Sequence, residues 1–139
     1  MQYAVPRRGL PSPQTLRRWA RAALERDARV TLRFVGTAEG RRLNAAYRHR
    51  DYATNVLTFV YDDVAGMVPV SGDIVLCVPV LRREARAQKR DPRVHCAHLV
   101  VHGILHLQGH DHARDADARR MEARESAVLL GLGLPDPYT

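Results

Sequence analysis

The sequence has little of what would cross-link a chain or place it in a membrane. Its two cysteines, Cys77 and Cys96, lie in apolar runs, which predicts buried free thiols rather than a disulfide or a metal finger. No apolar run approaches the ~20 residues that span a bilayer. The first thirteen residues lack the apolar core of a secretory signal. We therefore expect a cytoplasmic protein without membrane contact.

Lysine is almost absent, and arginine carries the positive charge. The chain has one lysine against 21 arginines, and its net charge is +7. Residues 1–50 contain twelve arginines and three acidic residues, and residues 82–93 contain six basic and two acidic residues. Such an excess favours a polyanionic partner, above all nucleic acid. The alternative is a solvated face in an arginine-rich composition, and charge alone leaves both readings open.

The hydrophobic patterns predict one small α+β domain. A chain of 139 residues fits a single domain over 1–139, and no repeat or linker divides it. Alternating β-formers predict strands at 29–36, 56–61 and 72–78. Helical periodicity predicts helices at 13–27, 37–47, 79–90, 94–108 and 115–130. We expect a mixed sheet of about four strands packed with about five helices.

Local signals predict where some of these elements begin. Ser12 followed by Pro13 is typical of a helix start, with the serine as N-cap. Thr37 is expected to cap the second helix, and residues 62–71 are expected to form a loop.

The strongest signal for a site is HGILHLQGHDH, residues 102–112. His102 and His106 are four apart and therefore share one face of a helix. Gly109 permits a left-handed turn that can return His112 to the same point. Three neutral imidazoles leave the fourth tetrahedral position open, as in a catalytic zinc site, where bound water becomes the nucleophile. We expect one Zn²⁺ per chain in a zincin-like site on a central helix, although nickel, copper or iron also suit imidazole.

Four further histidine and aspartate residues lie beside the three predicted ligands. We expect a solvated His110, the alternative being a contact with substrate. Asp111 can accept a hydrogen bond from a ligand imidazole or cap the turn, and the pattern does not separate these. His95 and His98 lie on the same helical stripe as His102, and packed or hydrogen-bonded structural histidines are expected there.

The residue that follows the first predicted ligand argues against peptide hydrolysis. The spacing is that of the metzincin peptidases, but Gly103 stands where their motif has its catalytic glutamate. Without this general base, a substrate with an internal nucleophile is favoured. RNA carries a 2′-hydroxyl beside its scissile phosphate, so the missing glutamate and the basic charge indicate the same substrate.

Three blocks together resemble a known family. The run HCAHLVVHGILHLQGHDH with the following MEARESAVLLGLGLPDPY is similar to the YbeY family of bacterial endoribonucleases. LNAAYRHRDYATNVLTFVYDD (43–63) and GDIVLC (72–77) match two further blocks of that family in the same order. The resemblance extends from about residue 43 to residue 138.

The resemblance carries specific expectations. It implies a small α+β fold related to zinc hydrolases, zinc bound by His102, His106 and His112, and Arg48 in a basic groove beside the metal, needed for RNA cleavage. It also implies action on single-stranded RNA, in maturation of the 3′ end of small-subunit ribosomal RNA and in ribosome quality control. Implied partners are the ribosome or its small subunit, with ribosomal proteins and GTPase assembly factors.

Three hypotheses therefore follow, and the first is preferred. The first is a zinc-dependent endoribonuclease in which Arg48 binds the phosphate. The second is a zincin-type metallopeptidase or amidase whose general base comes from Asp111, Glu122 or Glu125. The third is a non-catalytic ribosome-associated module with structural zinc.

Overall fold

A computed structural model describes residues 1–61, 70–110 and 112–139. Within these ranges a four-stranded sheet has the order β1–β2–β4–β3. Strands β1 (Gln2–Tyr3), β2 (Ala28–Val35) and β4 (Val70–Cys77) run parallel, and β3 (Val56–Val60) runs antiparallel to β4. The predicted small α+β fold with a mixed sheet is confirmed.

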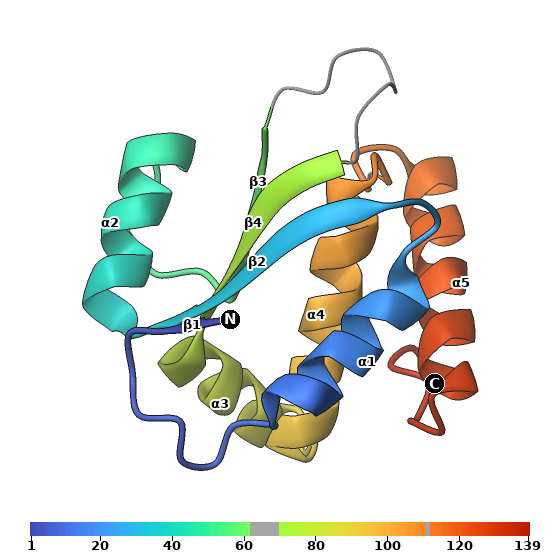
Figure 1. Cartoon of the computed structure of the whole chain (residues 1–139), viewed down its shortest axis with the longest axis horizontal. Helices are drawn as coiled ribbons and strands as arrows, with labels where there is room; N and C mark the ends of the chain where they lie inside the picture. Colours follow the sequence, from blue (N-terminus) through green and yellow to red (C-terminus); the bar gives the residue numbers. More distant parts are fainter. Residues whose placement is uncertain (62–69, 111) are drawn as a thin grey trace.

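Five helices of the described residues cover this sheet. They are α1 (Pro13–Ala23), α2 (Thr37–Arg48), α3 (Val78–Ala87), α4 (Pro92–Leu107) and α5 (Asp115–Gly131). Figure 1 shows α2 on one side of the sheet and α1, α4 and α5 on the other. Among the described residues, no helix is long and apolar enough to cross a bilayer.

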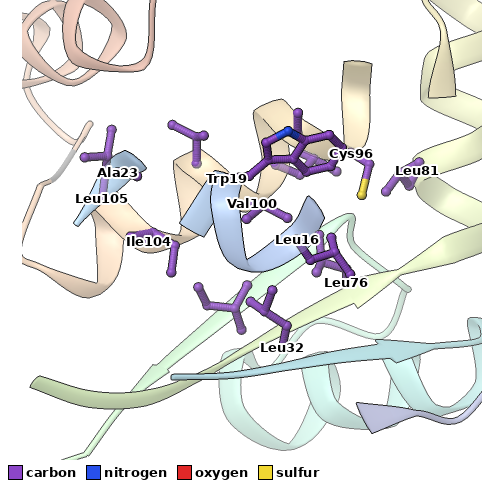
Figure 2. Close-up of a cluster of buried hydrophobic side chains, with 14 of the residues drawn as sticks. Leu16, Trp19, Ala23, Leu32, Leu76, Leu81, Cys96, Val100, Ile104 and Leu105 are labelled. Carbon is purple, nitrogen blue, oxygen red and sulfur yellow. The ribbon is translucent and has the colours of Figure 1, made fainter. Parts of the chain in front are cut away.

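Helix α4 lies at the centre of the larger core. Ten of its sixteen residues are buried, as expected for a helix that is apolar on nearly all sides. Figure 2 shows Leu16 and Trp19 of α1 beside Val100 and Ile104 of α4. This packing places α4 between α1, α5 and the sheet, and it leaves only a narrow stripe of α4 accessible.

Two glycines allow α4 to lie close to the sheet. A Cβ on Gly103 of α4 would lie 2.9 Å from Ile74 Cγ2 of β4. A Cβ on Gly72 of β4 would lie 2.3 Å from both Leu107 Cδ1 and the Phe59 carbonyl oxygen. Helix α4, β4 and β3 therefore approach one another so closely that both positions require glycine.

Several element limits differ from those predicted. Helix α1 ends at Ala23 rather than near residue 27, because Leu24 is already extended (φ −74°, ψ 132°). Strand β4 begins at Val70, inside the segment expected to be a loop, and the rest of that expected loop lies outside the described residues. Strand β1 has two residues, too few for a periodic signal, and it forms only by pairing with β2.

The predicted caps were right for α1 and wrong for α2. Ser12 Oγ accepts a hydrogen bond from the Thr15 backbone N–H at 3.2 Å, which confirms it as the N-cap of α1. Helix α2 begins at Thr37, and its N-cap is the extended Gly36, which has no side chain to cap with.

The two cysteines are free and buried, as predicted. Burial raises the pKa of Cys96 to about 12, so this thiol stays protonated and inert at neutral pH.

Replacing Gly72 by alanine tests the close approach of α4 to the sheet. We expect Gly72→Ala to lower the free energy of unfolding by about 3 kcal/mol, because the added methyl overlaps a backbone oxygen and a packed leucine. Urea unfolding followed by circular dichroism measures this change. Gly131→Ala is the control, since its Cβ would meet nothing within 4 Å; a loss of similar size there would contradict the explanation.

Candidate active site

Four histidines form one stripe along α4. His95, His98, His102 and His106 are three or four residues apart, and successive ring centroids lie 6.3, 6.4 and 6.4 Å from one another. A helix places such residues above one another on one face. His95 is buried, whereas His98, His102 and His106 are partly exposed.

The turn after α4 brings His112 to the last two histidines of this stripe. Gly109 has φ +102°, in the region that favours glycine. The His112 ring centroid then lies 5.6 Å from that of His102 and 5.9 Å from that of His106. The structure thus brings the three predicted ligands together. Asp111, whose role was left open, lies outside the described residues.

The three rings lie near one another, but their centroids are farther apart than in a site that holds a zinc ion. Among the described residues, no group of three His, Cys, Asp or Glu could hold a metal as it stands. Tetrahedral zinc with Zn–N bonds of about 2.0 Å would hold ring centroids about 5 Å apart, so each ring would have to move inward by an ångström or less.

The hydrogen bonds of two of these rings suit a metal ligand. His102 Nδ1 lies 3.1 Å from Glu125 Oε2, and His106 Nδ1 lies 3.0 Å from the His110 carbonyl oxygen. A ring that donates from Nδ1 presents its Nε2 lone pair on the opposite side, the usual arrangement of a metal-binding imidazole. Burial lowers the pKa of His106, and nearby positive groups including Arg48 lower it further. The neutral form that binds metals is therefore favoured, and the donor set fits zinc.

Arg48 shares one cavity with the three histidines. This cavity has a volume of about 380 Å³, and Arg50 and Asn55 also line it. Arg48 is the last residue of α2, and the turn that follows is held by Arg41 bonded to Asp51 and by Asn44 Nδ2 donating to the Tyr52 carbonyl oxygen. In the described part of the chain, no carboxylate lines the cavity. Its charge therefore suits an anion.

Comparison with known proteins agrees with this arrangement. The family model described as "Endoribonuclease YbeY" matches residues 12–133. The chain is 51% identical to the Endoribonuclease YbeY of Nitrosospira multiformis, covering 99% of this chain and 79% of that protein. It is 50% identical to that of Nitrosomonas eutropha, covering 99% and 96%. The chain belongs to the YbeY family of endoribonucleases. The predicted family and enzyme class are confirmed.

A solved structure supports the fold of this YbeY-family chain. The solution structure of a Thermotoga maritima protein superposes with a TM-score of 0.58 at 20% sequence identity, covering 95% of this chain and 90% of that one. At this identity the likeness concerns the arrangement of helices and strands alone.

Three other histidines of the YbeY-family chain, His95, His98 and His110, pair with glutamates. His95 Nε2 lies 2.9 Å from Glu84 Oε1, and His98 Nε2 lies 2.7 Å from Glu125 Oε1, which confirms the expectation of hydrogen-bonded structural histidines. The expectation of a solvated His110 was wrong. Its Nε2 lies 2.7 Å from Glu25 Oε1, and its side chain is 26% exposed, because the turn at Gly109 directs the chain back against the residues that follow α1.

Glu125 is the residue whose role the sequence reasoning missed, since it was considered only as the general base of a peptidase. It lies in α5 with 1% of its surface exposed. Its position among Met121, Val128 and Leu129 on the buried face of α5 was the available signal, because a carboxylate on an apolar stripe requires partners.

Glu125 is charged at neutral pH and is a poor base. Burial acts to raise its pKa, but hydrogen bonds from His102, His98 and Tyr138 outweigh burial and lower the pKa to about 2. A carboxylate of this kind accepts hydrogen bonds and does not take a proton from a substrate near pH 7.

The position of Gly103 gives a second reason against a peptidase. Its Cα faces Ile74 of β4 rather than open space, since an added Cβ would lie 2.9 Å from Ile74 Cγ2. A glutamate at this position would have to displace the buried Ile74 side chain. The packing at Gly103 therefore leaves no room for the glutamate that serves as general base in peptidases.

The low pKa of Glu125 predicts acid-sensitive stability of the metal-free protein. A depressed folded-state pKa contributes stability that is present above the unfolded value of about 4.5 and is lost as pH falls toward 2. Glu125→Gln should therefore flatten the fall in unfolding free energy between pH 6 and pH 3, measured by urea unfolding. The control is Glu122→Gln at an exposed neighbour. An equal effect of the two substitutions would refute the assignment.

Proposed function

We propose that this chain is a zinc-dependent, single-strand-specific endoribonuclease of the cytoplasm. It acts in maturation of the 3′ end of small-subunit ribosomal RNA and in ribosome quality control. The observation that carries the proposal is the single cavity in which Arg48 faces the three clustered imidazoles and which the described residues line without a carboxylate. Its partners are RNA and the small ribosomal subunit, with ribosomal proteins and GTPase assembly factors.

In this proposal His102, His106 and His112 hold one Zn²⁺ in a zincin-like site on α4. The bound ion supplies Lewis acidity, which polarises a phosphate oxygen and lowers the pKa of water. The chain orients two of the three rings through the Nδ1 bonds to Glu125 and to the His110 carbonyl. These bonds use Nδ1 of the two rings and leave Nε2 of each available to a metal.

Arg48 binds the scissile phosphate. Its guanidinium makes no ion pair within the described residues, and Arg48 lines the cavity from the last turn of α2. A guanidinium bonds two phosphate oxygens at once, and it stabilises the negative charge that grows as the phosphodiester is attacked. Arg50 in the same cavity adds positive charge along the path of the RNA backbone.

The attacking group is either the adjacent 2′-hydroxyl or water. A substrate that brings its own nucleophile suits a cavity whose described lining offers no carboxylate base. Analysis of the cleaved ends distinguishes the two routes, since a 2′,3′-cyclic phosphate arises only from attack by the 2′-hydroxyl.

The two other hypotheses are less well supported. A peptidase needs a general base. Of the two candidates that the structure describes, Glu125 is fully engaged by its hydrogen bonds, and Glu122 does not line the cavity of the three histidines and Arg48. A structural zinc module needs a closed coordination sphere, whereas the three histidines face an open cavity. Zinc-loaded protein that cleaves a mixed peptide library but no RNA would favour the peptidase.

Replacing Arg48 tests its role in binding phosphate. We expect Arg48→Ala to lower kcat for a single-stranded RNA about 100-fold, as removal of one transition-state donor does elsewhere, with unchanged zinc content. Arg48→Lys should recover only part, since lysine lacks the two-pronged geometry. The matched control is Arg42→Ala, an exposed arginine of the same helix that does not line the cavity. Wild-type cleavage by Arg48→Ala would exclude the proposed role.

Removing one imidazole tests the ligand set. We expect purified wild-type protein to hold about one zinc per chain and His112→Ala to hold far less, because three ligands are the minimum of such a site. Elemental analysis measures the content. His110→Ala is the control, since it removes a neighbouring imidazole yet keeps the backbone carbonyl that accepts from His106. Full zinc occupancy in His112→Ala would eliminate this set of ligands.

A further inference from the structure

The segment after α5 folds back onto the histidine stripe. It follows the region that the family model matches, which ends at residue 133. Ser126 Oγ donates to Asp136 Oδ1 at 2.8 Å, and the Tyr138 backbone N–H donates to the same oxygen at 2.9 Å. The Arg90 guanidinium also donates to the Pro137 carbonyl oxygen. Figure 1 shows the chain turning back after α5. These bonds give Tyr138 a defined position.

Tyr138 reaches the carboxylate that contacts His102. Its hydroxyl donates to Glu125 Oε1 at 2.6 Å, and its ring lies edge-on to that of His98 at a centroid distance of 5.6 Å. His98 Nε2 lies 2.7 Å from the same Oε1, and His102 Nδ1 lies 3.1 Å from Oε2. One oxygen of Glu125 is thus used by Tyr138 and His98, and the other is used by His102.

This division of the two oxygens determines how Glu125 faces His102. The last torsion of a glutamate side chain is soft, so a carboxylate held at one oxygen alone can rotate. A short bond from a hydroxyl to a charged carboxylate is strong, and Glu125 is almost completely buried. Fixing Oε1 therefore fixes the plane of the carboxylate and keeps Oε2 on His102 Nδ1. The Tyr138 hydroxyl remains a donor at neutral pH, because burial and the Glu125 charge raise its pKa well above the usual range.

We propose that Tyr138 is a positioning residue for His102 and acts through Glu125, so that the segment after α5 sets the zinc affinity of the site. The proposal rests on the proposed function, since it assumes zinc at His102. Partners that orient a ligand imidazole in this way change metal affinity about 10- to 100-fold elsewhere. Tyr138 touches neither the ion nor the substrate in this role.

A different role for Tyr138 would have a different signature. The residue is 47% exposed and borders a second cavity of about 390 Å³, which shares His102 with the first. If the ring served only to stack on an RNA base, its loss would raise KM for RNA and leave zinc affinity unchanged. Positioning through Glu125 predicts a change in zinc affinity even without RNA.

A double-mutant cycle on zinc affinity tests the proposal. Dissociation constants for Zn²⁺ are measured without RNA, by competition with a chromophoric chelator, for the wild type, Tyr138→Phe, Glu125→Gln and the double variant. We expect Tyr138→Phe to weaken zinc binding about 3- to 10-fold and Glu125→Gln about 10- to 100-fold. The double variant should bind as weakly as Glu125→Gln alone, because Tyr138 has no route to His102 once Glu125 is changed.

The control and a second readout separate positioning from general damage. Tyr61→Phe removes another hydroxyl that donates to a carboxylate, that of Asp73, at an exposed position, and it should bind zinc like the wild type. The absorption spectrum of the Co²⁺-loaded protein should change for Tyr138→Phe and stay the same for Tyr61→Phe. Asp136→Ala, which removes the bonds from Ser126 and the Tyr138 backbone N–H but keeps the Tyr138 side chain, should weaken zinc binding in the same direction.

Each outcome decides one point. Wild-type zinc affinity in Tyr138→Phe, or effects of the two single substitutions that multiply in the double variant, would overturn the positioning role and leave the proposed function standing. A wild-type protein that binds no zinc would overturn the proposed function itself, and the positioning role with it.

Discussion

Helix α4 is the centre of the core and also bears the histidines of the candidate site. The packing of the other helices and of the sheet depends on these two roles. Its apolar residues are covered by α1, α5 and the sheet, and His98, His102 and His106 stay partly exposed. The close approach of α4 to β4 depends on Gly72 and Gly103, where no Cβ fits. The same packing that buries the helix also excludes a glutamate from the position that peptidases of this spacing use.

The second constraint is a buried charge. Glu125 lies within the apolar contact of α5 with α4, where an unpaired carboxylate would be costly. Bonds from His98, His102 and Tyr138 offset that cost, and together they link α4, α5 and the segment after α5. Glu125 thus stabilises the packing of these elements and also orients His102, a proposed zinc ligand.

The charge of the cavity connects this architecture with the family. Arg48 and Arg50 approach the histidines from α2 and the turn after it, on the opposite side of the sheet from α1. A basic cavity whose described lining lacks carboxylates suits a polyanion that supplies its own nucleophile. Membership of the YbeY endoribonucleases is consistent with that chemistry.

The sequence by itself determined what local geometry controls. Helical spacing brought His102 and His106 to one face, Gly109 permitted the turn that returns His112, and Ser12 capped α1. Composition and the resemblance together named the family. Only the tertiary structure decided the rest. Arg48 of α2 lines the same cavity as the histidines of α4, and His110 pairs with Glu25. Glu125 contacts His102, and Tyr138 contacts Glu125. These contacts join residues far apart in the chain, and no periodicity records which distant side chains will meet when a core closes.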